Sequence, residues 1–176
     1  MNNSQQIKTM VYTALFVALI TIGSFIFIPI GPVPIVLQNM FVLLSAIILG
    51  PLQASICVGI YLLSGFAGLP VFAGGVSGLG KLVGPTGGYL IGYLPAVLVT
   101  GYISKTLGKK LSSYIIAMSI GSLFIYSIGV PWLMVVASLN LKKALIVGMY
   151  PFLIGDVLKI IAAAFIAKKT SPLLKQ

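Results

Sequence analysis

The sequence lacks histidine, arginine and glutamate, and its only acidic residue is Asp156. Without histidine, a histidine-based metal site and a Ser-His-Asp catalytic centre are both excluded. A single aspartate also leaves almost no side chains for acid–base or metal chemistry. We therefore expect a protein that is not an enzyme and that uses no cofactor and no bound metal.

Cysteine is almost as scarce as acidic residues. Cys57 is the only one, so the chain cannot form an internal disulfide. It lies within an apolar run, where a cysteine behaves as a small packing residue.

Charge of any kind is rare, at 7% of residues, whereas hydrophobic residues make up 59%. Because a soluble domain carries about 25% charged residues, this composition predicts an integral membrane protein. The apolar residues run continuously, which favours helical spans over a β-barrel. The net charge of +10 comes from lysines that mostly flank the apolar runs. Such lysines are typical topology anchors, so we expect contact with a lipid bilayer and not with nucleic acid.

The apolar runs predict one all-α transmembrane domain over residues 1–176. Six helices are expected, at about residues 10–28, 35–50, 52–66, 85–104, 112–139 and 144–167. Prolines at 29–34 and the Gly50-Pro51 pair separate the first three. Pro131 is expected to kink the fifth helix or to move its end into the membrane interface, and Pro151 lies near the start of the sixth.

Six spans would place both termini on the same side of the membrane. That side would then carry most of the lysines, namely Lys8, Lys105, Lys109, Lys110, Lys168, Lys169 and Lys175. The other side would carry Lys81, Lys142 and Lys143. The positive-inside rule therefore predicts cytoplasmic termini.

Residues 65–92 contain ten of the chain's twenty glycines. Glycine permits positive φ and is unfavourable inside a helix, so this stretch is predicted to be irregular and to lie outside, at a membrane boundary. Backbone polar groups cannot face lipid, so the segment should cap the bundle or line a cavity. We interpret it as half of a binding site.

Asp156 and Lys159 are the strongest candidates in the sequence for the other half of the binding site. At spacing i, i+3 they share a helix face, and charges inside a bilayer usually mark a function. Three interpretations stay open: a structural ion pair, a proton relay, or a ligand clamp. In the clamp, lysine would bind a carboxylate and aspartate would accept from N–H donors.

The spacing of Gly75, Gly80 and Lys81 is similar to the start of a phosphate-binding loop. That motif requires serine or threonine after the lysine, where this chain has Leu82, and it requires a preceding strand. We therefore expect no ATP binding by this chain. Any active transport would draw its energy from a partner or an ion gradient.

Several weaker features have two interpretations each. Gln38 and Asn39 could bond across helices or to a ligand. Phe72, Tyr89, Tyr93 and Trp132 could be interfacial belt residues or the wall of a ligand site. The small residues Ala14 and Ala18, at i, i+4, could pack within the chain or against another helix.

Taken together, these motifs resemble the BioY family, the biotin-binding S components of energy-coupling-factor (ECF) transporters. The resemblance covers about residues 7–168. It rests on PVP at 32–34, LQ at 37–38, GLPVFAGG at 68–75, GPTGGY at 84–89, and Pro151, Gly155, Asp156 and Lys159 near the end.

The resemblance implies a six-helix bundle with a substrate pocket near the outer face. It implies that the glycine-rich loop closes over biotin and that Asp156 and Lys159 supply polar contacts. Substrate contacts are thus expected at Gln38, Gly74, Gly75, Gly84, Pro85, Gly88, Tyr89, Asp156 and Lys159. Ala14 and Ala18 match the motif with which S components dock on the transmembrane coupling component, and two cytoplasmic ATPases then drive transport.

Two positions depart from some relatives. Val76 stands where an asparagine follows the paired glycines, and Leu90 stands where an arginine follows Gly-Gly-Tyr. Polar contacts to the ligand would be fewer here, or rearranged.

The resemblance therefore implies a vitamin-capturing subunit in the cytoplasmic membrane of a prokaryote, with biotin as its transported ligand. The alternatives are an S component for another vitamin and a stand-alone transporter that uses Asp156 as a proton site.

Overall fold

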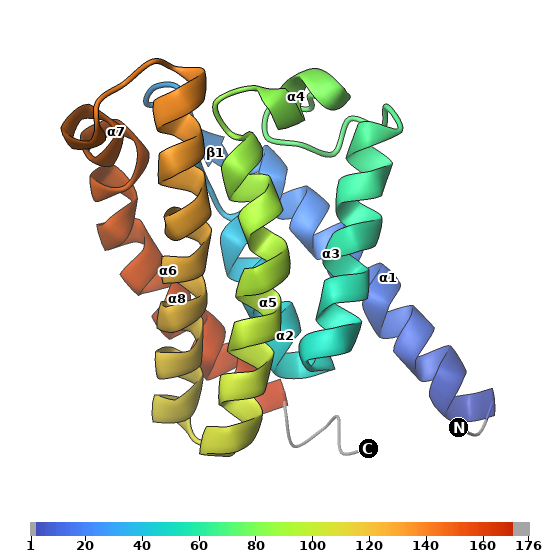
Figure 1. The fold of residues 1–176 in the computed structure, drawn as a ribbon. Coiled ribbons are helices and arrows are strands. Elements are labelled where there is room, and N and C mark those ends of the chain that lie inside the picture. Colours follow the sequence, from blue (N-terminus) through green and yellow to red (C-terminus); the bar gives the residue numbers. More distant parts are fainter. Residues whose placement is uncertain (1–2, 171–176) are drawn as a thin grey trace.

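The computed structural model describes residues 3–170, which form a bundle of helices (Figure 1). Its long elements are α1 (Asn3–Phe25), α2 (Gln38–Leu49), α3 (Pro51–Phe66), α5 (Gly87–Leu107), α6 (Leu111–Val136) and α8 (Tyr150–Thr170). Its short elements are the strands β1 (Phe27–Ile28) and β2 (Ile35–Val36) and the helices α4 (Leu79–Val83) and α7 (Leu141–Gly148). The expected all-α membrane bundle is confirmed.

Four helical segments of the described chain are long and apolar enough to cross a membrane: α1, α5, α6, and α7 together with α8. Helices α2 and α3 are shorter, at 12 and 16 residues. At 1.5 Å per residue α2 covers about 18 Å, well short of the roughly 30 Å hydrocarbon core. The antiparallel hairpin β1–β2 precedes α2 and continues the path toward the α4 end of the bundle (Figure 1). The polar first turn of α2 therefore begins inside the bundle.

The sixth apolar run was expected as one helix over 144–167, but the structure divides it. Asn140 caps α7 by accepting a hydrogen bond from the Lys143 backbone N–H at 2.9 Å. The helix ends at Met149, which has φ −137° and ψ −57°, and α8 starts at Tyr150. Pro151 accounts for the break, because it has no N–H to continue the α7 hydrogen bonds.

Other boundaries also differ from the expected ones. The first helix extends over Asn3–Phe25, rather than 10–28, and the second begins at Gln38 because residues 35 and 36 belong to β2. The fourth expected helix, α5, ends at Leu107, and the fifth, α6, continues through Pro131 to Val136. Helix α4 was not anticipated, because a five-residue helix among glycines has no apolar period to reveal it.

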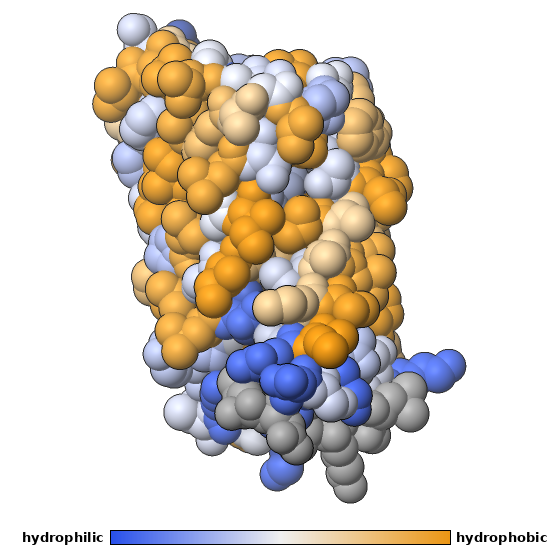
Figure 2. All heavy atoms as spheres, turned by 90° about the vertical axis from the view of Figure 1, so that its right-hand side faces the viewer, coloured by the Kyte–Doolittle hydropathy of each residue, from blue (hydrophilic) through white to orange (hydrophobic). Residues whose placement is uncertain are grey.

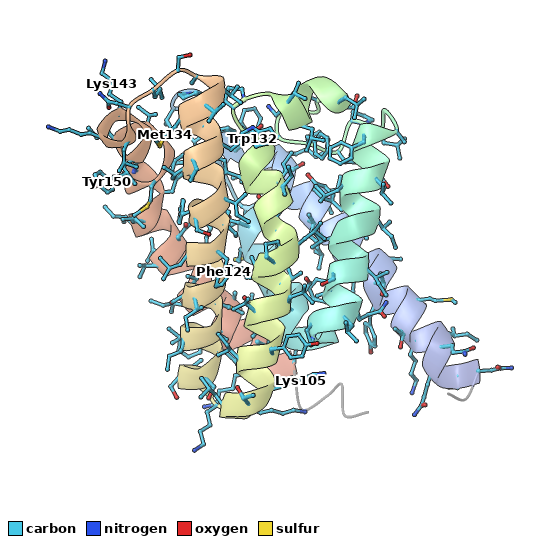
Figure 3. All side chains as sticks on the ribbon, in the orientation of Figure 1. Lys105, Phe124, Trp132, Met134, Lys143 and Tyr150 are labelled. Carbon is cyan, nitrogen blue, oxygen red and sulfur yellow. The ribbon has the colours of Figure 1, made fainter. Side chains whose placement is uncertain are left out.

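Lysines lie at both ends of the bundle. Helix α1 begins and α8 ends at the lower end in Figure 1, whereas α4 and α7 lie at the upper end. Lys105 lies at the lower end and Lys143 at the upper end in Figure 3. A hydrophobic surface occupies the height between, with hydrophilic residues gathered below it in Figure 2. Lys175, one of the lysines assigned to the terminal side, lies outside the described residues.

Helices α5 and α6 make the most extensive helix–helix contact in the described bundle and approach closely through glycines. A Cβ atom at Gly92 would lie 3.2 Å from the Ile125 backbone. One at Gly88 would overlap Trp132 and lie 3.0 Å from the Ile128 carbonyl oxygen. Gly88 and Gly92 thus form a helix-packing surface on α5, as small residues commonly do in membrane bundles.

Candidate ligand-binding cavity

A cavity opens between α2, α5, α6 and α8, beneath the segment that carries α4. It holds about 640 Å³ of space, including the part open to solvent. Its apolar lining is Val33, Pro34, Val36, Phe72, Ala73, Leu90, Ile125 and Phe152. Its polar lining is Gln38, Asn39, Lys81, Thr86, Tyr89, Tyr93, Ser122, Tyr126, Asp156 and Lys159.

Asp156 is the centre of the polar lining. Its Oδ1 atom accepts hydrogen bonds from Asn39 Nδ2 and from Lys159 Nζ, both at 2.9 Å. Its Oδ2 atom accepts a hydrogen bond from the Tyr126 hydroxyl. Lys159 Nζ also donates to Asn39 Oδ1, at 3.2 Å. The side chains of Asp156 and Lys159 are only 6% and 12% exposed, so the ion pair is largely removed from solvent.

This network joins three helices at one point. Asp156 and Lys159 meet because i, i+3 residues lie on one face of α8. Asn39 comes from the first turn of α2, and Tyr126 from the middle of α6. A charge inside a membrane protein is retained only where other groups compensate it, and here each charge has both an opposite charge and an amide. The ion pair as a whole is neutral.

Aromatic rings form the wall beside this network. The rings of Tyr89 and Tyr126 pack edge to face, with their centroids 6.4 Å apart. The Tyr89 hydroxyl donates to the Gly148 carbonyl oxygen at 2.8 Å, which ties α5 to the end of α7. Both rings line the cavity, while their hydroxyl groups are occupied by the protein.

The glycine-rich segment covers the cavity through two glycines with positive φ. Gly74 and Gly75 have φ of 82° and 71°, and they make the tight turn in which Phe72 N–H donates to the Val76 carbonyl at 3.0 Å. Phe72 is fully buried and packs edge to face on Tyr61, with centroids 5.7 Å apart. This turn anchors the segment on α3.

The other end of the segment is held by α6. Trp132, which lies at the top of α6 in Figure 3, donates its indole N–H to the Gly84 carbonyl oxygen at 2.9 Å. Gly87 and Gly88 lie against the same side chain, where a Cβ atom would collide with it or approach to 3.1 Å. Trp132 therefore acts here as a clamp on the segment.

The structure separates the expected contact residues into two groups. Gln38, Tyr89, Asp156 and Lys159 line the cavity. Five others do not line it and instead shape the segment above it: Gly74, Gly75, Gly84, Pro85 and Gly88. Ala14 and Ala18 are exposed on α1, on the face opposite Thr13, Phe16 and Ile20, which pack into the bundle. The interpretation in which the two alanines pack within the chain is therefore wrong.

Tyr126 and Lys81 are among the lining residues that were not singled out from the sequence as site residues. Tyr126 follows Ser122 by four residues, so two hydroxyl groups on one face of an apolar helix were the available signal. Lys81 was considered as part of an incomplete phosphate-binding motif and as one of the lysines on the side opposite the termini. Its isolation within a long uncharged region was the signal for a role of its own.

Gln38 lines the cavity with a buried side-chain amide that lies beside the Tyr61 hydroxyl. Its side chain is 2% exposed, and its Nε2 atom has no hydrogen-bond partner among the described residues. A buried donor without an acceptor costs about 1–3 kcal/mol, and native proteins usually avoid it. A ligand oxygen that reached this nitrogen would remove the cost.

The family model for the BioY family matches residues 1–176. The chain belongs to the BioY family. It is 39% identical over 167 residues to the biotin transporter BioY of Thermotoga maritima, covering 94% of this chain and 97% of the relative. It is 40% identical over 162 residues to a probable biotin transporter BioY of Pyrococcus horikoshii, covering 92% and 95%.

A solved structure shares the fold of this BioY-family chain. It is the crystal structure of the S-component for biotin from an ECF-type ABC transporter, with a TM-score of 0.91 and 35% identity. The match covers 98% of this chain and 95% of the other. These relatives are named as transporters and not as enzymes, which agrees with the expectation from the missing catalytic residues.

The ion pair of Asp156 and Lys159 leads to a prediction about the stability of a single and a double variant. Asp156→Asn should lower the free energy of unfolding by about 1–3 kcal/mol, because it leaves the Lys159 ammonium without its counter-charge. The double variant Asp156→Asn with Lys159→Met removes both charges and should recover most of that loss. Thermal unfolding of ligand-free protein in detergent measures both. A single variant as stable as the parent would show that the pair contributes nothing to the fold.

Proposed function

We propose that this protein captures biotin at the outer face of the cytoplasmic membrane and delivers it inward as the S component of an ATP-driven ECF transporter. The observation that carries the proposal is the cavity of the Asn39–Tyr126–Asp156–Lys159 network, set in a fold that matches a biotin S-component at a TM-score of 0.91.

The chemistry of biotin fits this lining. Its ureido ring offers two N–H donors and a carbonyl acceptor, its bicyclic core and chain are apolar, and it ends in a carboxylate. The cavity offers acceptors at Asp156 and Asn39, donors at Lys159 and Gln38, and a largely apolar and aromatic wall. A mostly apolar pocket with a few placed polar groups is typical of small-molecule sites.

The proposed partners are a transmembrane coupling component and two cytoplasmic ATPases. Because Leu82 replaces the hydroxyl residue of a nucleotide-binding motif, the energy must come from outside this chain. Ala14 and Ala18 offer a smooth exposed face on α1 where a partner helix can approach closely. The lysine distribution supports cytoplasmic termini, with the α4 end outside.

The proton-coupled alternative has no observation in its favour. Asp156 is engaged by an ammonium, an amide and a phenol, which makes it part of the cavity wall. An S component for another vitamin would share this fold. A binding assay with several vitamins distinguishes that alternative from a biotin S component.

Biotin binding by the isolated chain tests the substrate. We expect calorimetry in detergent to show saturable one-site binding of biotin and no binding of riboflavin or thiamine. Asp156→Asn and Lys159→Ala should each weaken the biotin affinity about tenfold or more, equivalent to about 1.4 kcal/mol. A folded sample that binds a different vitamin instead would contradict the substrate assignment and leave the fold intact.

Gln38→Leu should separate binding from stability. Removing an unpaired buried amide should leave the unfolding temperature unchanged or higher, yet weaken biotin binding about tenfold through the lost hydrogen bond. Gln53→Leu is the matched control, because Gln53 Nε2 is satisfied by Thr13 Oγ1 at 2.6 Å, away from the cavity. That variant should lose stability and keep its affinity for biotin. Equal biotin affinity in Gln38→Leu and the parent would exclude Gln38 as a ligand contact.

Bulky residues on the exposed face of α1 should block assembly. We expect the double variant Ala14→Leu with Ala18→Leu to bind biotin normally but to lose co-purification with its co-expressed coupling component and ATPases. Ser127→Leu, on an exposed position of α6, controls for added bulk facing lipid. Assembly that tolerates both leucines on α1 would place the partner elsewhere.

A further inference from the structure

Two lysines line the cavity, and only one of them has an acidic partner. Lys159 is paired with Asp156 at 2.9 Å. Asp156 is the only acidic side chain in the sequence, so no acidic side chain remains for Lys81. Within residues 3–170, Lys81 has neither an ion pair nor a side-chain hydrogen bond. The cavity therefore carries one uncompensated positive charge, and it comes from α4.

The position of Lys81 makes this charge available to a ligand. Lys81 lies in the middle of α4, is half-buried, and contributes to the lining from the covering segment. The segment is fixed on both sides of it. On one side Gly78 N–H donates to the Gly65 carbonyl of α3 at 2.8 Å, and on the other Trp132 of α6 holds the Gly84 carbonyl. Lys81 thus stands over the cavity from a short element that is attached at both ends.

A carboxylate that enters the cavity is drawn to Lys81 and not to Lys159. Near Lys159 a second carboxylate would approach the one on Asp156, and like charges repel strongly where water is scarce. Near Lys81 it would meet an ammonium with no competing anion. Charge-assisted hydrogen bonds of this kind are the strong ones in proteins.

We propose that Lys81 binds the carboxylate of the ligand and makes the cavity select an acid over its neutral amide. This inference rests on the proposed function, since it takes biotin as the ligand. It also orients the ligand: the carboxylate lies under α4, and the ureido ring lies at Asp156, Asn39, Lys159 and Tyr126. A ligand held in this way connects the covering segment to the network on α2, α6 and α8.

Calorimetry with biotin and biotinamide tests the charge directly, because the two ligands differ only in the terminal group. The parent protein should bind biotin about tenfold more tightly than biotinamide. Lys81→Met should lose that preference by weakening biotin alone, while its affinity for biotinamide stays that of the parent. Unchanged biotinamide binding also shows that the variant is folded. Lys81→Arg should keep a preference for the acid.

Lys143→Met is the matched control. Lys143 lies on α7 at the same end of the bundle but does not line the cavity (Figure 3). Its removal takes away one positive charge from that end, and it should leave both affinities and their ratio unchanged. A ratio that fell equally in both lysine variants would indicate a general electrostatic effect and would overturn the assignment to Lys81.

Two further outcomes would also overturn the proposal while the proposed function stands. One is a Lys81→Met protein that still prefers biotin over biotinamide by the parental ratio. The other is a Lys81→Met protein that loses affinity for both ligands equally, because Lys81 would then act through the conformation of the segment. A folded parent that binds neither ligand would instead contradict the proposed function, and the role of Lys81 would fall with it.

Discussion

The compensation of one buried carboxylate is the constraint on which the site depends. Asp156 is the only acidic residue of the chain, and a lone charge inside a bilayer is costly. Three groups compensate it, and each comes from a different part of the chain: Lys159 from α8, Asn39 from α2 and Tyr126 from α6. Because each of these groups has a fixed place, the three helices are held in one relative position where they border the cavity. The need to compensate the charge of Asp156 therefore also defines the geometry of the pocket.

The short helix α2 is what makes room for this arrangement. A helix that crossed the whole membrane would present apolar side chains at every depth, and its polar first turn would lie at the surface. Because α2 has only 12 residues and follows the β1–β2 hairpin, Gln38 and Asn39 stand within the bundle. The first N–H groups of a helix have no partner in the helix itself, so its start is a polar element even before side chains are considered. The fold thus brings polarity to the cavity through a helix end instead of through added charges.

Part of this could be predicted from the sequence, and the limit has a physical cause. The contact between Asp156 and Lys159 could be predicted from the sequence, because i, i+3 residues lie on the same face of a helix. The contact with Tyr126 could not be predicted, because a tyrosine in an apolar helix can face lipid, another helix or a cavity. Only the tertiary packing determines which of these it faces. The break between α7 and α8 is hidden by continuous hydropathy, although Pro151 marks its place. The glycines of residues 74–88 were recognised as important, but their contribution is backbone shape: Gly74 and Gly75 make a turn, and Gly88 admits Trp132.

The covering segment combines firm ends with a lightly packed middle. Phe72 is buried against Tyr61 at one end, and Trp132 clamps Gly84 at the other. Helix α4 between them has five residues and none of them is buried. Segments with few buried apolar contacts are those that open most readily, so motion in this protein should concentrate at α4 while the network around Asp156 stays in place. Lys81, the uncompensated charge of the cavity, lies in that middle. An anion that bound there would supply the contact that α4 lacks.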